Sequence, residues 1–228
     1  MTRVDSAVER LRDYWRKRRM RRFRATVGLR DDWHVLDVGG TPHLWSGASE
    51  RQTVTMLNLP SIAAEMEAST NPTRHVLPGD VCSLPDIARS YDLVFSNSVL
   101  EHVGSSRRQQ QFASSVRSCR AYWVQVPAPT FPIEVHCRYL FWWLLPPAIR
   151  RKRIRAWKRT SRPFLGRQMA GTRPIDRKLL HRLFPDGQIA TERFLGITKS
   201  YYVWRVDTTG ARRTDYLVRN PVHVRDHL

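Results

Sequence analysis

One short segment, VLDVGG at residues 35–40, constrains the fold of this chain more than any other. The apolar residues of a buried strand run through Asp37 into Gly39 and Gly40. Glycine has no Cβ, so a ligand can approach the backbone of this turn closely. In open α/β sheets, ligands bind outside the carboxyl ends of the strands, so the segment predicts both a fold class and the place of a site.

Strand-like and helix-like segments alternate along most of the chain. Short apolar or alternating runs predict strands at 34–38, 53–59, 74–80, 90–99 and 121–127, and two more within 188–207. Apolar residues at helical spacing predict a helix at 4–24. We also expect a short helix at 177–185, a short helix or turn at 61–69, and either a helix or a loop and helix at 99–120. This order predicts a mostly parallel α/β sheet that an antiparallel pair completes.

The alternation stops between residues 128 and 175, a stretch rich in proline, aromatic residues and arginine. This stretch predicts an insert after the fifth strand. The chain therefore divides into a basic N-terminal helix at 1–30, a domain at 31–207 that carries the insert, and a loose polar tail at 208–228.

The charge of the chain restricts its partners. The formal net charge is +19, and 34 of the 39 basic residues are arginine. A surface this positive favours anionic partners such as nucleic acid, acidic lipid or a phosphorylated substrate.

The cysteines and the apolar runs indicate where in the cell the protein is found. Three cysteines without a CxxC pair indicate a reduced protein with no disulfide framework. Residues 1–24 lack the apolar core of a signal peptide, and the longest apolar run, 139–149, is too short to span a bilayer and contains two prolines. We therefore expect a cytoplasmic protein, with a peripheral position at the inner membrane surface as an alternative.

Polar residues follow three predicted strands at the edge where their carboxyl ends meet. Gly39 and Gly40 fit a ligand that lies close to the backbone, and Asp37 either orients an ammonium group or fixes the loop. Asn58 fits a ribose hydroxyl pair, and Asp80 fits the edge of an adenine. The residues that follow them and complete the predicted contacts are Leu59, Val81 and Cys82. A ligand that joins an amino acid, a ribose and an adenine is S-adenosylmethionine (SAM).

Three motifs in this part of the chain resemble the class I SAM-dependent methyltransferases of the type 11 group. They are LDVGG, DVCSLP and YDLVFSNSVLEHVG, of which the last is the most specific. A fourth motif, FPIEVH after the fifth strand, resembles a signature of one bacterial subgroup, and the likeness covers roughly residues 33–205. The resemblance implies a Rossmann-like sheet of seven strands with helices on both faces and SAM as the cofactor. It also implies that Ser96 and Asn97 line the floor beneath the methionine part.

The chain departs from the pattern of this family at three places. Thr41 and Pro42 replace the third small residue of the glycine loop, and Asn58 replaces an acid. Asn58 can still bond a ribose hydroxyl, but without charge assistance. Ser98 stands where the related quinone-biosynthesis O-methyltransferases carry an acid that takes part in binding a divalent metal.

Two pairs of residues are candidates for catalysis: Glu101 with His102, and Glu134 with His136. The i,i+2 spacing of the second pair in an extended segment places both side chains on one face. A histidine near its ordinary pKa accepts a proton at neutral pH, so His136 is a candidate general base for an acceptor hydroxyl. The structural alternatives are that Glu101 pairs with an arginine, that His102 packs behind the cofactor, and that His136 anchors the insert through hydrogen bonds. A further alternative joins all four side chains into a site for a divalent metal such as Mg²⁺.

The insert bears on the choice of substrate, because aromatic residues at 139–143 precede the cationic run IRRKRIRAWKR. Such a segment fits a lid over a small-molecule, sugar or lipid-linked acceptor, or a segment that lies on anionic lipid. We therefore expect a methyltransferase that acts on a hydroxyl oxygen. One alternative is a non-catalytic protein of this fold, and another is an RNA-directed methyltransferase. Either would bind nucleic acid or anionic membrane through its arginine-rich surface.

Overall fold

The computed structural model describes residues 3–46, 51–66, 73–134, 136–137, 139–160 and 162–207, without the side chains of residues 3–12. Within them the chain forms a seven-stranded sheet with the order β3-β2-β1-β4-β5-β7-β6. The strands are β1 (His34–Val38), β2 (Thr53–Asn58), β3 (Arg74–Pro78), β4 (Leu93–Asn97), β5 (Ala121–Pro127), β6 (Gln188–Phe194) and β7 (Ile197–Val206). The predicted tail at 208–228 lies outside the described residues, as does the end of the predicted helical segment at 61–69.

The directions of the strands confirm the predicted fold class. β3, β2, β1, β4 and β5 pair in parallel, whereas β7 is antiparallel to both β5 and β6. The parallel strands are buried along nearly all of β1, β2, β4 and β5. This burial explains why they are near-continuous apolar runs in the sequence.

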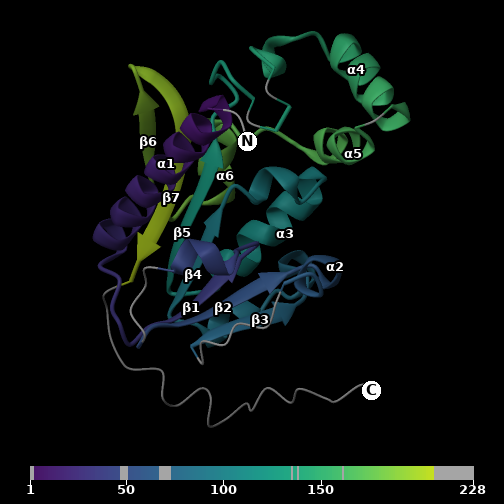
Figure 1. Ribbon diagram of the computed structural model, residues 1–228. Coiled ribbons are helices and arrows are strands. Elements are labelled where there is room, and N and C mark those ends of the chain that lie inside the picture. Colours follow the sequence, from purple (N-terminus) through teal and green to yellow (C-terminus); the bar gives the residue numbers. More distant parts are fainter. Residues whose placement is uncertain are drawn as a thin grey trace.

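Helices cover both faces of the sheet (Figure 1). α1 (Arg3–Val27) packs Met20, Phe23 and Val27 onto one face, where the ring of Phe23 meets those of Phe95 and Trp123 edge to face. α3 (Ser106–Arg117) and α6 (Arg177–Leu183) contribute to the core on the opposite face. The basic N-terminal helix is thus a packed layer of the fold.

The helical elements that the structure describes after β1 and β2 are single turns. η1 (Pro42–Trp45) is a single 3-10 turn after the glycines, and α2 (Pro60–Ala63) is a single helical turn after β2. Prolines begin both turns, as their fixed φ allows at a first helical position. α1 takes part in covering the face above η1, because Phe23 contacts Trp45.

The insert between β5 and β6 has a small core of its own. It contains η5 (Trp142–Leu144), α4 (Pro147–Arg159) and α5 (Pro163–Gly171), and α4 and α5 project together from one end of the sheet (Figure 1). The rings of Trp142 and Trp157 stack at 5.2 Å between centroids, with Cys137 and Met169 in the same cluster. Part of the aromatic run therefore forms a core within the insert.

Two further sequence expectations concern cysteines and membranes. Cys82, Cys119 and Cys137 are all free and buried. In the described part of the chain, every helix is too short or too polar to cross a bilayer.

Candidate functional site

The carboxyl ends of the parallel strands bring several predicted residues to one edge. Val38 at the end of β1 is level with Ser96 of β4, and Asn58 at the end of β2 is level with Pro78 of β3. Gly39 and Gly79 follow directly, and their amides donate to carbonyl oxygens of β2. The register therefore places the glycine turn, Asn58, the Gly79–Asp80 segment and Asn97 along one rim of the sheet.

Asp37 holds the glycine turn from beneath. Its side chain is buried, and Trp45 Nε1 donates to Oδ2 at 2.6 Å. Burial raises the pKa of Asp37 to about 7, although the bond from Trp45 opposes the shift. A Cβ on Gly40 would lie 1.8 Å from Oδ2, so only glycine fits there. These contacts give Asp37 a role in the loop itself, and its contact with a cofactor stays a prediction.

Asn58 bonds to the same turn, which explains why an amide replaces an acid here. Its Nδ2 donates to the carbonyl oxygen of Gly40 at 2.9 Å. A carboxylate has no proton to donate, so an aspartate would place two acceptors against each other. Leu59, the next residue, is exposed at the rim. The Asn58 amide therefore supports the loop, and its Oδ1 is the atom that remains for a ribose hydroxyl.

Asp80 uses both carboxylate oxygens within the protein. Oδ1 accepts from the backbone amide of Cys82 at 3.0 Å, and Oδ2 accepts from Arg108 at 2.7 Å. Burial alone would raise the pKa of Asp80, but these two partners outweigh it and hold the pKa below its ordinary value. The side chains of Val81 and Cys82 point into the core. The carboxylate is partly exposed, and each oxygen can accept a second bond, so adenine contact by Asp80 stays a prediction.

Ser96 and Asn97 are also engaged at the end of β4. Ser96 Oγ donates to the carbonyl oxygen of Val38 at 3.1 Å, and Asn97 Oδ1 accepts from Arg19 at 2.8 Å. Arg19 also pairs with Glu192 of β6 at 3.2 Å. The sequence does not single out Arg19, because one arginine among many on a helix carries no local signal of its partner.

The second candidate set forms a line of hydrogen bonds next to this rim. His136 Nδ1 lies 2.7 Å from Glu134 Oε1, and His136 Nε2 lies 3.1 Å from His102 Nε2. His102 Nδ1 lies 3.1 Å from the hydroxyl of Thr172, and Trp143 Nε1 donates to Glu134 Oε2 at 2.5 Å. We call Glu134, His136, His102 and Thr172 the histidine line. It joins the turn after β4, the loop after β5 and the end of α5.

The groups at the two ends of the histidine line determine which ring nitrogens carry a proton. Burial alone would raise the pKa of Glu134, but the bonds from His136 and Trp143 hold it below its ordinary value, so Glu134 is an anion that accepts from His136 Nδ1–H. Burial, with His136 beside it, lowers the pKa of His102 to about 4, so His102 is neutral. Thr172 Oγ1 donates its one proton to the carbonyl oxygen of Gln168 at 2.8 Å, so it accepts from His102 Nδ1–H, and His102 Nε2 faces His136 Nε2 as an acceptor.

Glu101 lies beside the histidine line without joining it. Its carboxylate is buried, and neither oxygen has a hydrogen-bond partner among the described residues. His102 Nε2 is 3.8 Å from Oε1, beyond hydrogen-bond distance. Burial raises the pKa of Glu101 to about 8. The predicted alternative, a hydrogen-bonded pair with an arginine, is therefore wrong for Glu101.

The four predicted catalytic side chains do not form a metal-binding set. Among the residues that the structure describes, no three His, Cys, Asp or Glu side chains converge as metal ligands. The chemistry below therefore uses no metal ion.

Two members of the site were not predicted from the sequence. Thr172 and Trp143 both belong to the insert and bond to the ends of the histidine line. Trp143 is one of several aromatic residues in its run, and a lone threonine after a helix has no distinguishing pattern. Only the folded insert brings them to the site.

No family model matches the chain, and no curated protein matches it. Solved structures that resemble it include SAM-dependent methyltransferases from Methanosarcina mazei and Aquifex aeolicus. The first is 15% identical, covers 78% of this chain and 94% of that one, and has a TM-score of 0.47. The second is 13% identical, covers 81% and 87%, and has a TM-score of 0.47.

Two further structures are longer than this chain. PigF with SAH is 15% identical over 76% of this chain and 56% of that one, with a TM-score of 0.46. Human N-acetylserotonin methyltransferase in complex with SAM is 12% identical over 78% and 49%, also with a TM-score of 0.46. The chain therefore spans about half the length of these two proteins.

Proposed function

We propose that this protein is a SAM-dependent methyltransferase that transfers a methyl group to a hydroxyl oxygen of a small-molecule, sugar or lipid-linked acceptor. The observation that carries the proposal is the adjacency of the strand-end rim and the histidine line. Val99 packs so closely on Gly39 that a Cβ there would lie 2.5 Å from it, and His102 follows three residues later. A cofactor on the glycine turn would thus have proton acceptors next to it.

The rim fits an adenosyl cofactor through its backbone and a few polar atoms. Gly39 has a φ of +74°, a conformation that side chains with a Cβ rarely adopt, and it exposes the backbone of the turn. Asn58 Oδ1 and Leu59 would contact the ribose, and Asn97 would lie beneath the methionine part. When bound, SAM supplies an activated methyl group, so the protein has to align the acceptor and remove its proton.

The histidine line accounts for the removal of the proton. The acceptor hydroxyl, in the place that His102 takes beside His136 Nε2, gives its proton to that nitrogen while its oxygen takes the methyl group, and the Glu134 anion 2.7 Å from His136 Nδ1 stabilises the charge. His102, whose pKa is about 4, does not keep the proton and acts as the link to Thr172. Glu134 orients His136 and stabilises its charged form, as a carboxylate does for a histidine base.

Calorimetric titration with S-adenosylhomocysteine tests cofactor binding. We expect the wild-type chain to bind, and Gly40→Ala to lose binding, because the added Cβ would displace Asp37 and the turn. The matched control is Gly171→Ala, where the new Cβ would meet nothing within 4 Å. Absence of binding by the folded wild-type chain would overturn the proposal.

Transfer of tritiated methyl groups to a fractionated cell extract tests the reaction. We expect label in the small-molecule or lipid fraction, and His136→Ala should lower the rate by about 10²–10⁴-fold with cofactor affinity unchanged. Full turnover by His136→Ala would remove His136 as the base.

The cationic insert favours a second candidate function, an RNA-directed or non-catalytic protein that binds anionic polymers or lipid. In the same assay, label in the RNA fraction supports the RNA-directed enzyme. RNA or vesicle binding that persists without any methyl transfer supports the non-catalytic protein.

A further inference from the structure

The insert carries almost only positive charge, because Glu134, near its start, is its one acid. Residues 135–175 contain 11 lysines and arginines and no aspartate or glutamate, in a chain whose net charge is +19. This segment therefore carries more than half of the net charge in less than a fifth of the length. Such a concentration of one sign attracts anionic partners.

Four of these arginines line one cavity in the insert. The cavity has a volume of about 500 Å³ and lies between the start of α4 and the end of α5. Trp142 and Trp143 contribute apolar wall, and the arginines are Arg150, Arg151, Arg155 and Arg173. Ligand cavities commonly have about 300–1,000 Å³. The space thus holds more than a single inorganic ion.

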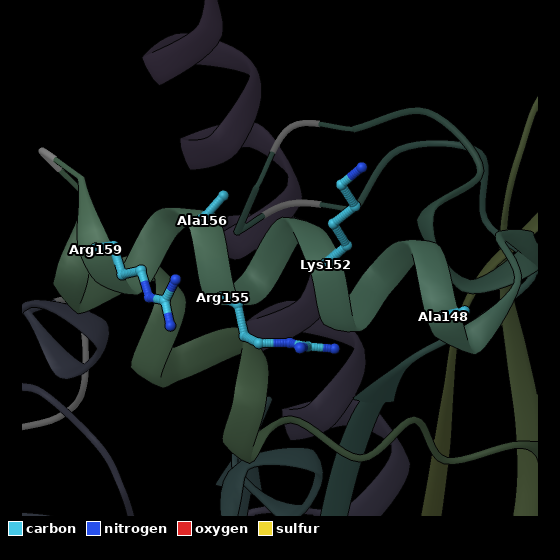
Figure 2. Close-up of a pocket in the computed structure, with 5 residues that line it drawn as sticks. All are labelled: Ala148, Lys152, Arg155, Ala156 and Arg159. Atoms are coloured by element: carbon cyan, nitrogen blue, oxygen red, sulfur yellow. The ribbon is translucent and has the colours of Figure 1, made fainter.

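A second cavity of about 550 Å³ continues the cationic surface along α4 (Figure 2). It is lined by Lys152, Arg155 and Arg159 together with Ala148 and Ala156, and Arg155 also lines the first cavity. The two alanines are small, so a ligand can lie close to the helix between the cations. No acidic residue lines either cavity.

The arginines of the first cavity have no acidic partners among the described residues. Around the sheet, by contrast, Arg19 pairs with Glu192, and Arg108 pairs with Asp80. Arg150 Nε is buried and lacks a hydrogen-bond partner, while its guanidinium lies over the ring of Trp143 at 5.2 Å. Burial, with Arg151 beside it, lowers the pKa of Arg150. A bound anion would reduce the repulsion between the two guanidinium groups.

The cavity adjoins the histidine line directly. Thr172 and Trp143 line the cavity, and the same two residues bond to His102 and Glu134. The backbone amide of Arg173 donates to the carbonyl oxygen of Glu101 at 2.7 Å. A molecule that filled the cavity would therefore extend to the proton acceptors.

We propose that the cavity between α4 and α5 binds a phosphate or diphosphate group of the methyl acceptor and so places the acceptor hydroxyl against the histidine line. Arginine binds phosphate through paired N–H donors, and four arginines fit a group with several negative charges. The proposal deepens the proposed function and rests on it. It names the substrate class as phosphate-bearing acceptors.

Calorimetric titration of the full chain with inorganic pyrophosphate tests this site. We expect the wild-type chain to bind, and Arg151→Gln with Arg155→Gln to weaken binding about tenfold or more, because two charge-assisted contacts are lost. Both side chains are exposed, so the fold should tolerate the change. The matched control is Arg177→Gln with Arg182→Gln, which removes the same charge from exposed positions on α6.

The outcomes separate this proposal from the proposed function. S-adenosylhomocysteine should bind all three proteins equally, and its failure to bind the wild-type chain would count against the methyltransferase alone. No pyrophosphate binding at millimolar concentration, or equal weakening in both double variants, would overturn the cavity as a site.

A vesicle arm distinguishes two sources of the phosphate. Competition by phosphatidylglycerol vesicles, but not by phosphatidylcholine vesicles, would identify a lipid headgroup as the source. Pyrophosphate binding that neither vesicle alters would identify a soluble phosphate ester. Both results support the site. It would be contradicted if pyrophosphate did not bind and if Arg151→Gln with Arg155→Gln bound vesicles as well as the wild-type chain does.

Discussion

The sheet and the insert use their charged residues in opposite ways. Around the sheet, acids such as Asp80, Asp186 and Glu192 each pair with arginines, and these pairs join elements that are distant in sequence. In the insert there is no acid to pair with between residues 135 and 175. Charged side chains in the sheet region therefore join elements of the fold, whereas the cations of the insert remain available for a ligand.

The two regions also differ in how their aromatic residues pack. In the sheet, Trp123 lies fully buried and stacks on Phe95 at 5.2 Å and on Tyr202 at 5.7 Å. In the insert, Trp157 stacks on Trp142 in a cluster of only four buried residues. A small cluster excludes less apolar surface from water, so the insert should open more readily than the sheet.

The largest expected effect comes from truncating one tryptophan in each region. Trp123→Ala should lower the free energy of unfolding by about 3–5 kcal/mol, because it leaves a large cavity in the central core. Urea unfolding followed by circular dichroism measures this loss. Trp157→Ala should instead open the insert locally, which limited proteolysis at the cations of α4 detects.

Cofactor binding provides the control for this pair of variants. Trp157→Ala should retain the affinity for S-adenosylhomocysteine, because the strand-end rim does not depend on the insert. If Trp157→Ala lowers global stability as much as Trp123→Ala, the insert and the sheet form one cooperative unit and the comparison fails.

The same difference explains how much could be predicted from the sequence. Buried parallel strands are near-continuous apolar runs, so β1 and β4 were located by pattern alone, and the glycine turn followed from Gly39 and Gly40. The insert has neither a strand period nor a long helical repeat. The sequence therefore predicts that an insert is present, but not how it folds.

The side-chain partners at the site were the least predictable part. The residue types at the strand ends were found, but the bonds from Trp45 to Asp37 and from Asn58 to Gly40 depend on the path of the loop. The bond between His102 and Thr172 joins residues 70 positions apart. Long-range contacts of this kind follow from packing, and a local pattern does not encode them.

An effect of intermediate size, on the pH dependence of stability, is expected from Glu101, a buried acid between the sheet and the insert that makes no hydrogen bond to a cation among the described residues. The folded-state pKa of Glu101 is about 8, above the ordinary value of 4.5, so the folded chain binds a proton that the unfolded chain releases. Stability should therefore fall as the pH rises from about 4.5 to about 8. Glu101→Gln removes this ionisation and should reduce the fall between pH 5 and pH 8.5 by on the order of 3 kcal/mol.

Thermal unfolding of both proteins at the two pH values measures this effect. Comparing the change in the variant with the change in the wild-type chain cancels the contributions of other groups, including His102 with its lowered pKa. An equal fall in stability in the two proteins would show that Glu101 has a charged partner in solution.

The smallest expected effect concerns Asp176, the first acid after the insert. Its Oδ1 accepts from the backbone amide of Leu179 at 2.7 Å and caps the first turn of α6. Asp176→Ala should lower stability by about 1 kcal/mol, the usual cost of losing an N-cap. Asp176→Asn keeps an acceptor oxygen at the same place and should retain most of the stability in thermal unfolding. If Asp176→Asn is as destabilising as Asp176→Ala, the negative charge matters more than the cap. Asp176 would then act as a counterion for the cations of the insert, and the separation of charge between the two regions would be less complete than the described contacts indicate.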